Sequence, residues 1–156
     1  MKKKIVAIVP VRKGSQRIKN KNFKKFAGSN LLEIKLESLK KVKLIDQIIV
    51  STDSKEAIRI AKKHGISYHV REKYFASSKC NNSEFYDNLA RSISGDFLMY
   101  TPCTAPLIKS NTIQSLIKKF LDVYPKYDSM NTVNFVKEHL WLKNKPINFN
   151  QKRIPN

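Results

Sequence analysis

Five consecutive apolar residues, Ile5 to Val9, follow three lysines at the start of the chain. A strand with one face in water alternates apolar and polar side chains, whereas an unbroken apolar run is typical of a strand covered on both faces. We therefore expect a strand over 4–10 in the interior of a mostly parallel sheet that carries helices on both faces.

The rest of the chain alternates strand-like and helix-like patterns with short connections, which favours an α/β fold. Asp53, three residues before Glu56, predicts the N-cap of one helix, and Ser110 predicts the N-cap of another. In the first helix Leu32, Leu36 and Leu39 form the apolar stripe, so its lysines and glutamates are expected on the solvent side. We expect a loop over 71–82. Further strands are expected over 46–52, 67–70, 97–100 and 131–136, and helices over 31–42, 53–63, 83–94 and from 110 onward.

Length and composition exclude several classes of protein. A chain of 156 residues that is 41% apolar is long enough for one domain with a core. Two cysteines, Cys80 and Cys103, are too few for a disulfide framework, and no zinc-ligand spacing is present. No apolar run is long enough to cross a bilayer, and the N-terminal run is too short for a signal peptide. We expect a cytoplasmic protein without a membrane partner.

The net charge of +19 is the largest compositional deviation. Such an excess attracts polyanions, so a basic nucleic-acid-binding module is the alternative function. However, only six of the 31 basic residues are arginine, and the lysines are spread over the whole chain, as the codon usage of an AT-biased genome also produces. No nucleic-acid-binding motif is present, so nucleic acid is not the expected partner.

The segment Val11–Asn22 follows the first strand directly and contains five basic residues and Gly14. In open parallel sheets ligands bind where the strands end, and a glycine with cations in such a loop suits a phosphate group. The loop lacks the second glycine of a Walker A motif and the three glycines of a dinucleotide fingerprint. From these residues alone, a nucleotide site and a solvated basic loop both remain open.

Five short sequence blocks follow one another along the chain: Pro10-Val-Arg-Lys-Gly-Ser-Gln-Arg17, Lys21-Asn22, Ile49-Val-Ser-Thr-Asp53, Arg71 and Cys103-Thr-Ala-Pro-Leu107. The sequence thereby resembles the acylneuraminate cytidylyltransferase family, the CMP-sialic acid synthetases and their relatives for Kdo, legionaminic and pseudaminic acids. The resemblance implies a Rossmann-like nucleotidyltransferase fold. It also implies transfer of CMP from CTP to the anomeric hydroxyl of a nine- or eight-carbon 2-keto sugar acid, with release of pyrophosphate.

The same resemblance implies roles for individual residues. Arg12 and Lys21 would be catalytic, Thr104 would face the sugar acid, and Mg²⁺ would accompany CTP. Gln16 and Pro102 stand where the family often has lysine and glutamine. The residues implied in CTP binding are Arg12, Ser15, Gln16, Arg17, Lys21, Asn22, Arg71 and Ser83.

The C-terminal part departs from the family pattern. Family members carry an Asp-x-Asp-like metal-binding pair preceded by a dimerisation segment, whereas no Asp follows Asp128 here. We therefore expect a nucleotide-binding domain over 1–137 and an irregular tail over 138–156, the start of a missing segment, with a homodimer as a possible assembly. Asp53 is a weak metal candidate, because a helix cap explains it better. Neither a nucleophilic Cys103 nor a catalytic histidine is expected.

Overall fold

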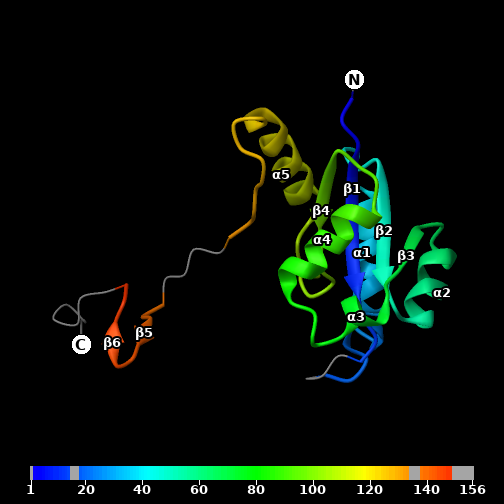
Figure 1. Cartoon of the computed structure of the whole chain (residues 1–156), viewed down its shortest axis with the longest axis horizontal. Helices are drawn as coiled ribbons and strands as arrows, with labels where there is room; N and C mark the ends of the chain where they lie inside the picture. The colour runs from blue at the N-terminus through cyan, green and yellow to red at the C-terminus, as the bar shows by residue number, and fades with distance from the viewer. Residues whose placement is uncertain (1, 15–17, 134–137, 149–156) are drawn as a thin grey trace.

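A computed structural model describes residues 2–14, 18–133 and 138–148 (Figure 1). Its central sheet has four parallel strands in the order β3-β2-β1-β4. These strands are β1 (Ile5–Val11), β2 (Gln47–Thr52), β3 (Ser67–Val70) and β4 (Phe97–Tyr100). The chain reaches β4 after β3 by crossing to the other side of β1, so the strand order reverses beside β1. A reversal of this kind opens a crevice at the carboxyl ends of the strands.

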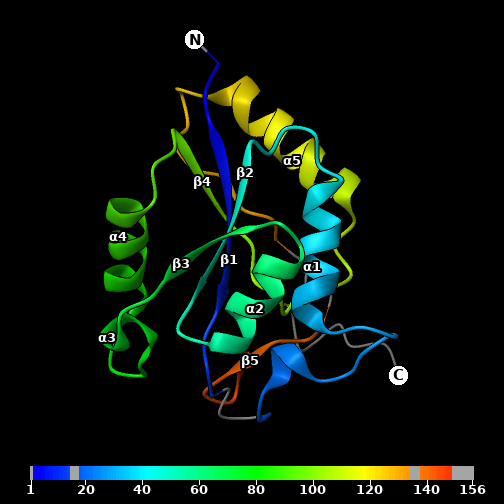
Figure 2. The ribbon, with the colours of Figure 1, turned by 90° about the vertical axis from the view of Figure 1, so that its right-hand side faces the viewer.

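Helices cover both faces of the sheet, as the apolar run in β1 predicts. Figure 2 shows α4 (Asn82–Ser92) on one side and α1 (Leu31–Lys40), α2 (Lys55–Lys63) and α5 (Ser110–Val123) on the other. The odd-numbered residues of β1 pack with α1, α2 and α5, while Val6 and Ile8 pack with α4. All five residues of the run are at most 5% exposed. The predicted α/β class with a mostly parallel sheet is confirmed.

Two aspartates hold the start of β1 between its neighbouring strands. Asp46, just before β2, accepts hydrogen bonds from the Ile5 N–H at 2.9 Å and from Lys2 Nζ. Asp96, just before β4, accepts from the Lys4 N–H at 2.7 Å. In each case the backbone hydrogen bond is the largest cause that lowers the pKa of the carboxyl group.

These two contacts predict acid lability. A carboxyl group whose pKa is lower in the folded state stabilises the fold above its unfolded pKa and loses that contribution as the pH falls through the folded value. We expect the free energy of unfolding to decrease below about pH 4. The double variant Asp46→Asn/Asp96→Asn should be less stable at neutral pH and lose less on acidification, as measured by urea unfolding at several pH values. Asp87→Asn, on the exposed face of α4, is the control; equal pH dependence of all three proteins would contradict this prediction.

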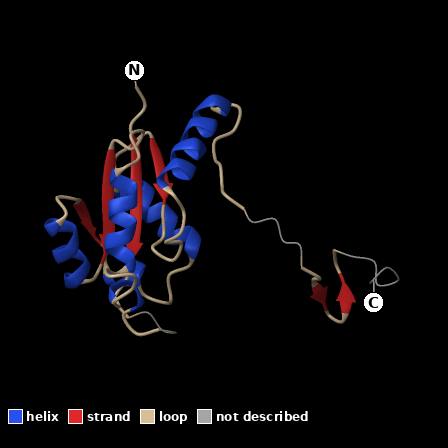
Figure 3. Cartoon of the chain, turned by 180° about the vertical axis from the view of Figure 1, so that it is seen from behind, coloured by secondary structure: helices blue, strands red, loops and turns tan. Residues whose placement is uncertain are grey.

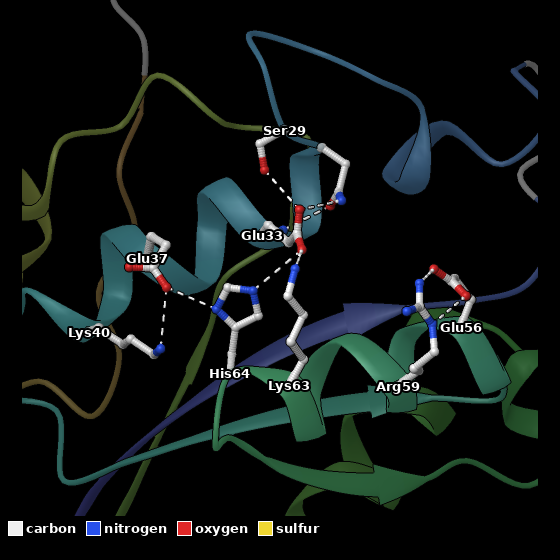
Figure 4. A network of polar contacts seen from close by, with 9 residues as sticks. Ser29, Glu33, Glu37, Lys40, Glu56, Arg59, Lys63 and His64 are labelled. Carbon is white, nitrogen blue, oxygen red and sulfur yellow. Dashed lines mark hydrogen bonds and ion pairs between the residues drawn. The ribbon is translucent and has the colours of Figure 1, made fainter.

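A polar network joins α1 to the end of α2 (Figure 4). Glu33 accepts from Ser29 Oγ at 2.9 Å and from Lys63 Nζ at 3.2 Å. His64 lies between Glu37, 2.9 Å from its Nδ1, and Glu33, 3.5 Å from its Nε2. His64 therefore links α1 to the end of α2, which lies in the same layer of helices.

The structure corrects several local predictions. Ser54, not Asp53, caps α2, since its side chain accepts from the Ala57 N–H. Lys109 occupies the N-cap of α5 without a side-chain bond, and Ser110 is its first residue. The predicted loop 71–82 contains the short helix α3 (Lys73–Ala76).

Lys35 contradicts the expected solvent side of α1, because it is buried among the leucines of that helix.

The C-terminal predictions have mixed outcomes. Residues 131–133 of the predicted fifth strand are not a strand, and the remainder lies outside the described residues. The stretch expected to be irregular contains the short antiparallel hairpin of β5 (Trp141–Leu142) and β6 (Lys145–Pro146), drawn in red in Figure 3. Within the described part of the chain, no helix has the length and apolar character that a membrane span requires.

Candidate active site

The register of the sheet brings the ends of three strands to one level. Val11 pairs with Thr52, and Thr52 pairs with Val70. The next residues, Arg12, Asp53 and Arg71, therefore leave neighbouring strands at the same edge of the sheet. β4 ends nearby, because Tyr100 pairs with Ile8 of β1. This convergence follows from parallel pairing alone and explains how residues far apart in sequence share one site.

The segment after β1 is shaped by its backbone. Gly14 has a φ of 75°, a left-handed conformation that favours glycine. Asp53 holds this segment, because its carboxylate accepts the Lys13 N–H at 2.7 Å. Asn20, also left-handed at a φ of 55°, leads into a short 3₁₀ helix, η1 (Lys21–Phe23). That helix places Lys21 and Asn22 opposite the end of β1.

A pocket of about 430 Å³ lies at this edge of the sheet. Its volume is in the range of small-molecule sites, which is roughly 300–1,000 Å³. Five of the predicted site residues come together in its lining: Arg12, Lys21, Asn22, Arg71 and Thr104. Three of these five carry a positive charge, so the pocket suits an anionic ligand.

Asn22 is a buried polar residue of the pocket lining. The residue is 9% exposed, and its Oδ1 is buried without a hydrogen-bond partner among the described residues. A buried amide oxygen without a partner carries an unfavourable desolvation free energy.

Arg71 is the most deeply placed cation of the pocket. Its guanidinium donates to the backbone oxygen of Ser51 at 2.8 Å and lies 4.5 Å from the centre of the Phe85 ring. Burial is the main cause that lowers the pKa of Arg71, and the charge of Asp53 opposes that effect. Arginine still remains protonated at neutral pH. The side chain is thus held rigidly, with one face on an aromatic ring and its charge next to the pocket.

Another part of the pocket lining comes from the end of β4 and the segment that follows it. Thr101 anchors this segment, since its N–H and its Oγ1 donate to the backbone oxygen of Ile8 at 2.9 Å and 3.2 Å. Tyr100 contacts the rings of Phe85 and Tyr86 edge-on, with centroids 6.3 Å and 5.3 Å apart. The pocket lining therefore combines three cations with aromatic rings and a threonine-containing loop.

Ser15, Gln16 and Arg17 lie outside the described residues, so their roles stay predictions. Ser83 is exposed in the first turn of α4 and is not part of the lining, so its role stays a prediction. The lining residues to which sequence reasoning gave no site role are Pro10, Ile18, Phe85, Tyr100, Pro102 and Cys103. For Tyr100 and Pro102 the strand-end position was the available signal.

The described residues do not form a metal cage of their own. Across 2–14, 18–133 and 138–148, no group of three or more His, Cys, Asp or Glu side chains could hold a metal ion. Asp53, the weak candidate, does not line the pocket and binds the Lys13 N–H. Mg²⁺ that arrives on a triphosphate, however, keeps several waters and needs few protein ligands.

Cys103 has the properties of a packed core residue. It is 2% exposed, and burial raises the pKa of its thiol to about 12. A nucleophilic cysteine needs the thiolate form, which this environment disfavours. Both observations agree with the expectation that Cys103 is not a nucleophile, which stays a prediction.

We expect Cys103→Ala to keep its catalytic rate while losing about 1 kcal/mol of stability, as typical for a small truncation in a core. In the unmodified chain, a thiol-specific disulfide reagent at pH 8 should react with the partly exposed Cys80 and reach Cys103 only on unfolding. Loss of turnover in Cys103→Ala with an unchanged melting temperature would contradict this.

Comparison with known proteins places this geometry in a family. The chain is 28% identical over 130 residues to a pseudaminic acid cytidylyltransferase of Campylobacter jejuni, covering 80% of this chain and 56% of that protein. It is 32% identical over 123 residues to an N-acylneuraminate cytidylyltransferase of Escherichia coli, covering 77% of this chain and 29% of the relative. The chain thus spans about half or less of the length of these relatives.

Solved structures show the same fold. A CMP:2-keto-3-deoxy-manno-octonic acid synthetase complexed with CTP matches with a TM-score of 0.65 at 17% identity, over 76% of this chain and 48% of that chain. A cytidylyltransferase from Leptospira borgpetersenii matches with a TM-score of 0.64 at 21% identity, over 80% and 52%. The predicted Rossmann-like nucleotidyltransferase fold is confirmed. A cytidylyltransferase family model matches residues 6–150, and the protein therefore belongs to the cytidylyltransferase family.

Proposed function

We propose that this chain binds CTP in the pocket at the carboxyl ends of β1, β3 and β4 and transfers its CMP moiety to a 2-keto sugar acid. The observation that carries the proposal is the convergence of Arg12, Lys21 and Arg71 on one pocket. None of the ion pairs between described residues includes any of these three cations. Their charge is thus available to a triphosphate.

The proposed reaction needs little covalent chemistry from the protein. The anomeric hydroxyl oxygen of the acceptor attacks the α-phosphorus of CTP and forms the new P–O bond, while the bond from that phosphorus to the bridging oxygen of the β-phosphate breaks. The hydroxyl proton passes to solvent, and pyrophosphate leaves. In such transfers catalysis rests on positioning and on neutralising charge. Arg12 and Lys21 are the groups assigned to that neutralisation.

The side chains that line the pocket suggest where each substrate binds. Arg12, Lys21 and Arg71 suit the triphosphate, and we assign Asn22 to the neighbourhood of the ribose, as the family resemblance implies. The loop with Thr104 is then left for the sugar acid, whose carboxylate would also benefit from the cations. Mg²⁺ is assigned to the CTP phosphates as part of the substrate, where it adds positive charge.

The curated relatives named above support a sugar acid as acceptor, since their names include pseudaminic acid and N-acylneuraminate cytidylyltransferases. The test is release of pyrophosphate from CTP with Mg²⁺ and a panel of sialic, pseudaminic, legionaminic and Kdo acids. We expect release that depends on one class of acceptor. CTP binding without release for any acceptor would overturn the transfer step while leaving the nucleotide site intact.

We also propose a homodimer, supported by exposed apolar side chains on the hairpin, Leu142 at 62% and Ile147 at 58%. Sedimentation equilibrium tests this directly. A monomer at every concentration would overturn it.

A further inference from the structure

Lys35 is a buried lysine within the apolar stripe of α1. The buried residues of this helix are Leu32, Lys35, Leu36 and Leu39, the spacing of a core-facing stripe, and Lys35 is only 2% exposed. Lysine is rarely buried to this extent without a partner of opposite charge. None of the ion pairs within the described ranges includes it.

The partner of Lys35 is the loop that forms one side of the pocket. Its Nζ donates a hydrogen bond to the backbone oxygen of Ala105 at 2.9 Å. Ala105 directly follows Thr104, which lines the pocket. Burial is the main cause that lowers the pKa of Lys35, and the nearby Cys103 of the same loop opposes this effect. An apolar residue would fill the same position in the core without a desolvation cost.

The loop is thereby held at two points. Thr101 binds the backbone of β1 through Ile8, and Ala105 binds Lys35 of α1. Thr104 lies between these two attachments. A hydrogen bond from an ammonium group is stronger than one between neutral groups, so the second attachment fixes the loop firmly.

We propose that Lys35 is a positioning residue, which orders the Thr104 side of the pocket for the acceptor through its hydrogen bond to Ala105. This inference rests on the proposed function, in which that side receives the sugar acid. It separates two contributions: Arg12, Lys21 and Arg71 determine CTP affinity, and the Lys35–Ala105 contact determines acceptor binding. Lys35 itself does not line the pocket.

The variant Lys35→Met keeps the length of the side chain and removes the donor. Replacing a buried charge by an apolar residue is frequently neutral or stabilising, so we expect an unchanged or higher melting temperature. The KM of the acceptor should nevertheless rise about tenfold or more, as loss of a charge-assisted hydrogen bond predicts. The dissociation constant of CTP should stay within about twofold. A residue with a merely structural role would lower the melting temperature and weaken both substrates together.

Three further measurements make the outcome decisive. Lys35→Gln keeps an N–H donor and should recover part of the acceptor affinity, and it replaces Lys35→Met if that variant does not fold. Lys40→Met, an exposed lysine of the same helix, is the matched control and should leave both substrates unaffected. Amide hydrogen exchange of residues 101–109 should accelerate in Lys35→Met even without any acceptor. The proposal would be overturned if the acceptor KM and the hydrogen exchange of this loop were both unchanged in Lys35→Met. If the wild type showed no turnover while exchange was faster in Lys35→Met, only the proposed transfer would be overturned.

Discussion

Replacing Arg12 with alanine is expected to weaken CTP binding by about 100-fold and to reduce turnover by at least as much, the range seen when a preorganised charged donor is removed from a transition state. Arg12 leaves the central strand where the sheet order reverses and lines the pocket beside Lys21. Its guanidinium adds positive charge there without being needed for the core. We therefore expect the melting temperature without ligand to stay nearly constant. Isothermal titration with CTP measures the effect.

Arg59→Ala is the matched control for this variant. Arg59 is an exposed arginine of α2 that pairs with Glu56 and does not line the pocket. Arg59→Ala removes one positive charge, as Arg12→Ala does. A comparable loss of CTP binding in this control would therefore show that the overall charge of the chain attracts the nucleotide. Arg12→Lys should retain intermediate affinity, because lysine keeps the charge but not the fork of donors.

Arg71→Met is expected to reduce both stability and CTP binding, which distinguishes it from Arg12→Ala. The change removes the hydrogen bond to the Ser51 backbone oxygen and the contact with the Phe85 ring. Leaving a buried carbonyl without its partner should lower the free energy of unfolding by about 2 kcal/mol. Loss of the cation should also weaken CTP binding by about 100-fold. Chemical denaturation and titration with CTP measure the two effects separately.

Arg91→Met serves as the control, since Arg91 is exposed on α4 and pairs with Asp87 at the surface. Its effect on stability should be within about 0.5 kcal/mol. Arg71→Lys should fold more stably than Arg71→Met but lack the flat guanidinium that lies on Phe85. A stable Arg71→Met protein with wild-type CTP affinity would contradict the role given to this arginine.

The fold was largely predictable because its signals are local. The run Ile5–Val9 indicates a strand covered on both faces, and parallel pairing then requires the strand ends to meet at one edge. The basic segment that contains Arg12 could therefore be placed at this edge from the pattern of the residues alone. The resemblance to known enzymes added Arg71, Asn22 and Thr104, which also line the pocket.

The wrong predictions concern residues whose environment is set by contacts that are distant in sequence. Asp53 and Ser54 are both good helix caps, and tertiary contact decided between them, because the Asp53 carboxylate binds the Lys13 N–H. Lys35 was expected in solvent, since periodicity counts every lysine as polar and cannot detect the distant carbonyl of Ala105. Aromatic contacts between α4 and β4 at Tyr100 likewise depend on how the elements pack, which no local pattern contains.

Thermal unfolding with equal concentrations of CTP, UTP, ATP and GTP, in Mg²⁺ at moderate salt, shows whether the pocket selects CTP. A ligand that binds only the folded chain raises its stability according to affinity, by about 2.7 kcal/mol at 100 times the dissociation constant. We predict a clear increase in melting temperature with CTP, small increases with the other three nucleotides, and loss of the CTP effect in Arg12→Ala. Equal increases with all four nucleotides that decline together as salt is added would contradict the claim and would show that the net charge alone attracts them.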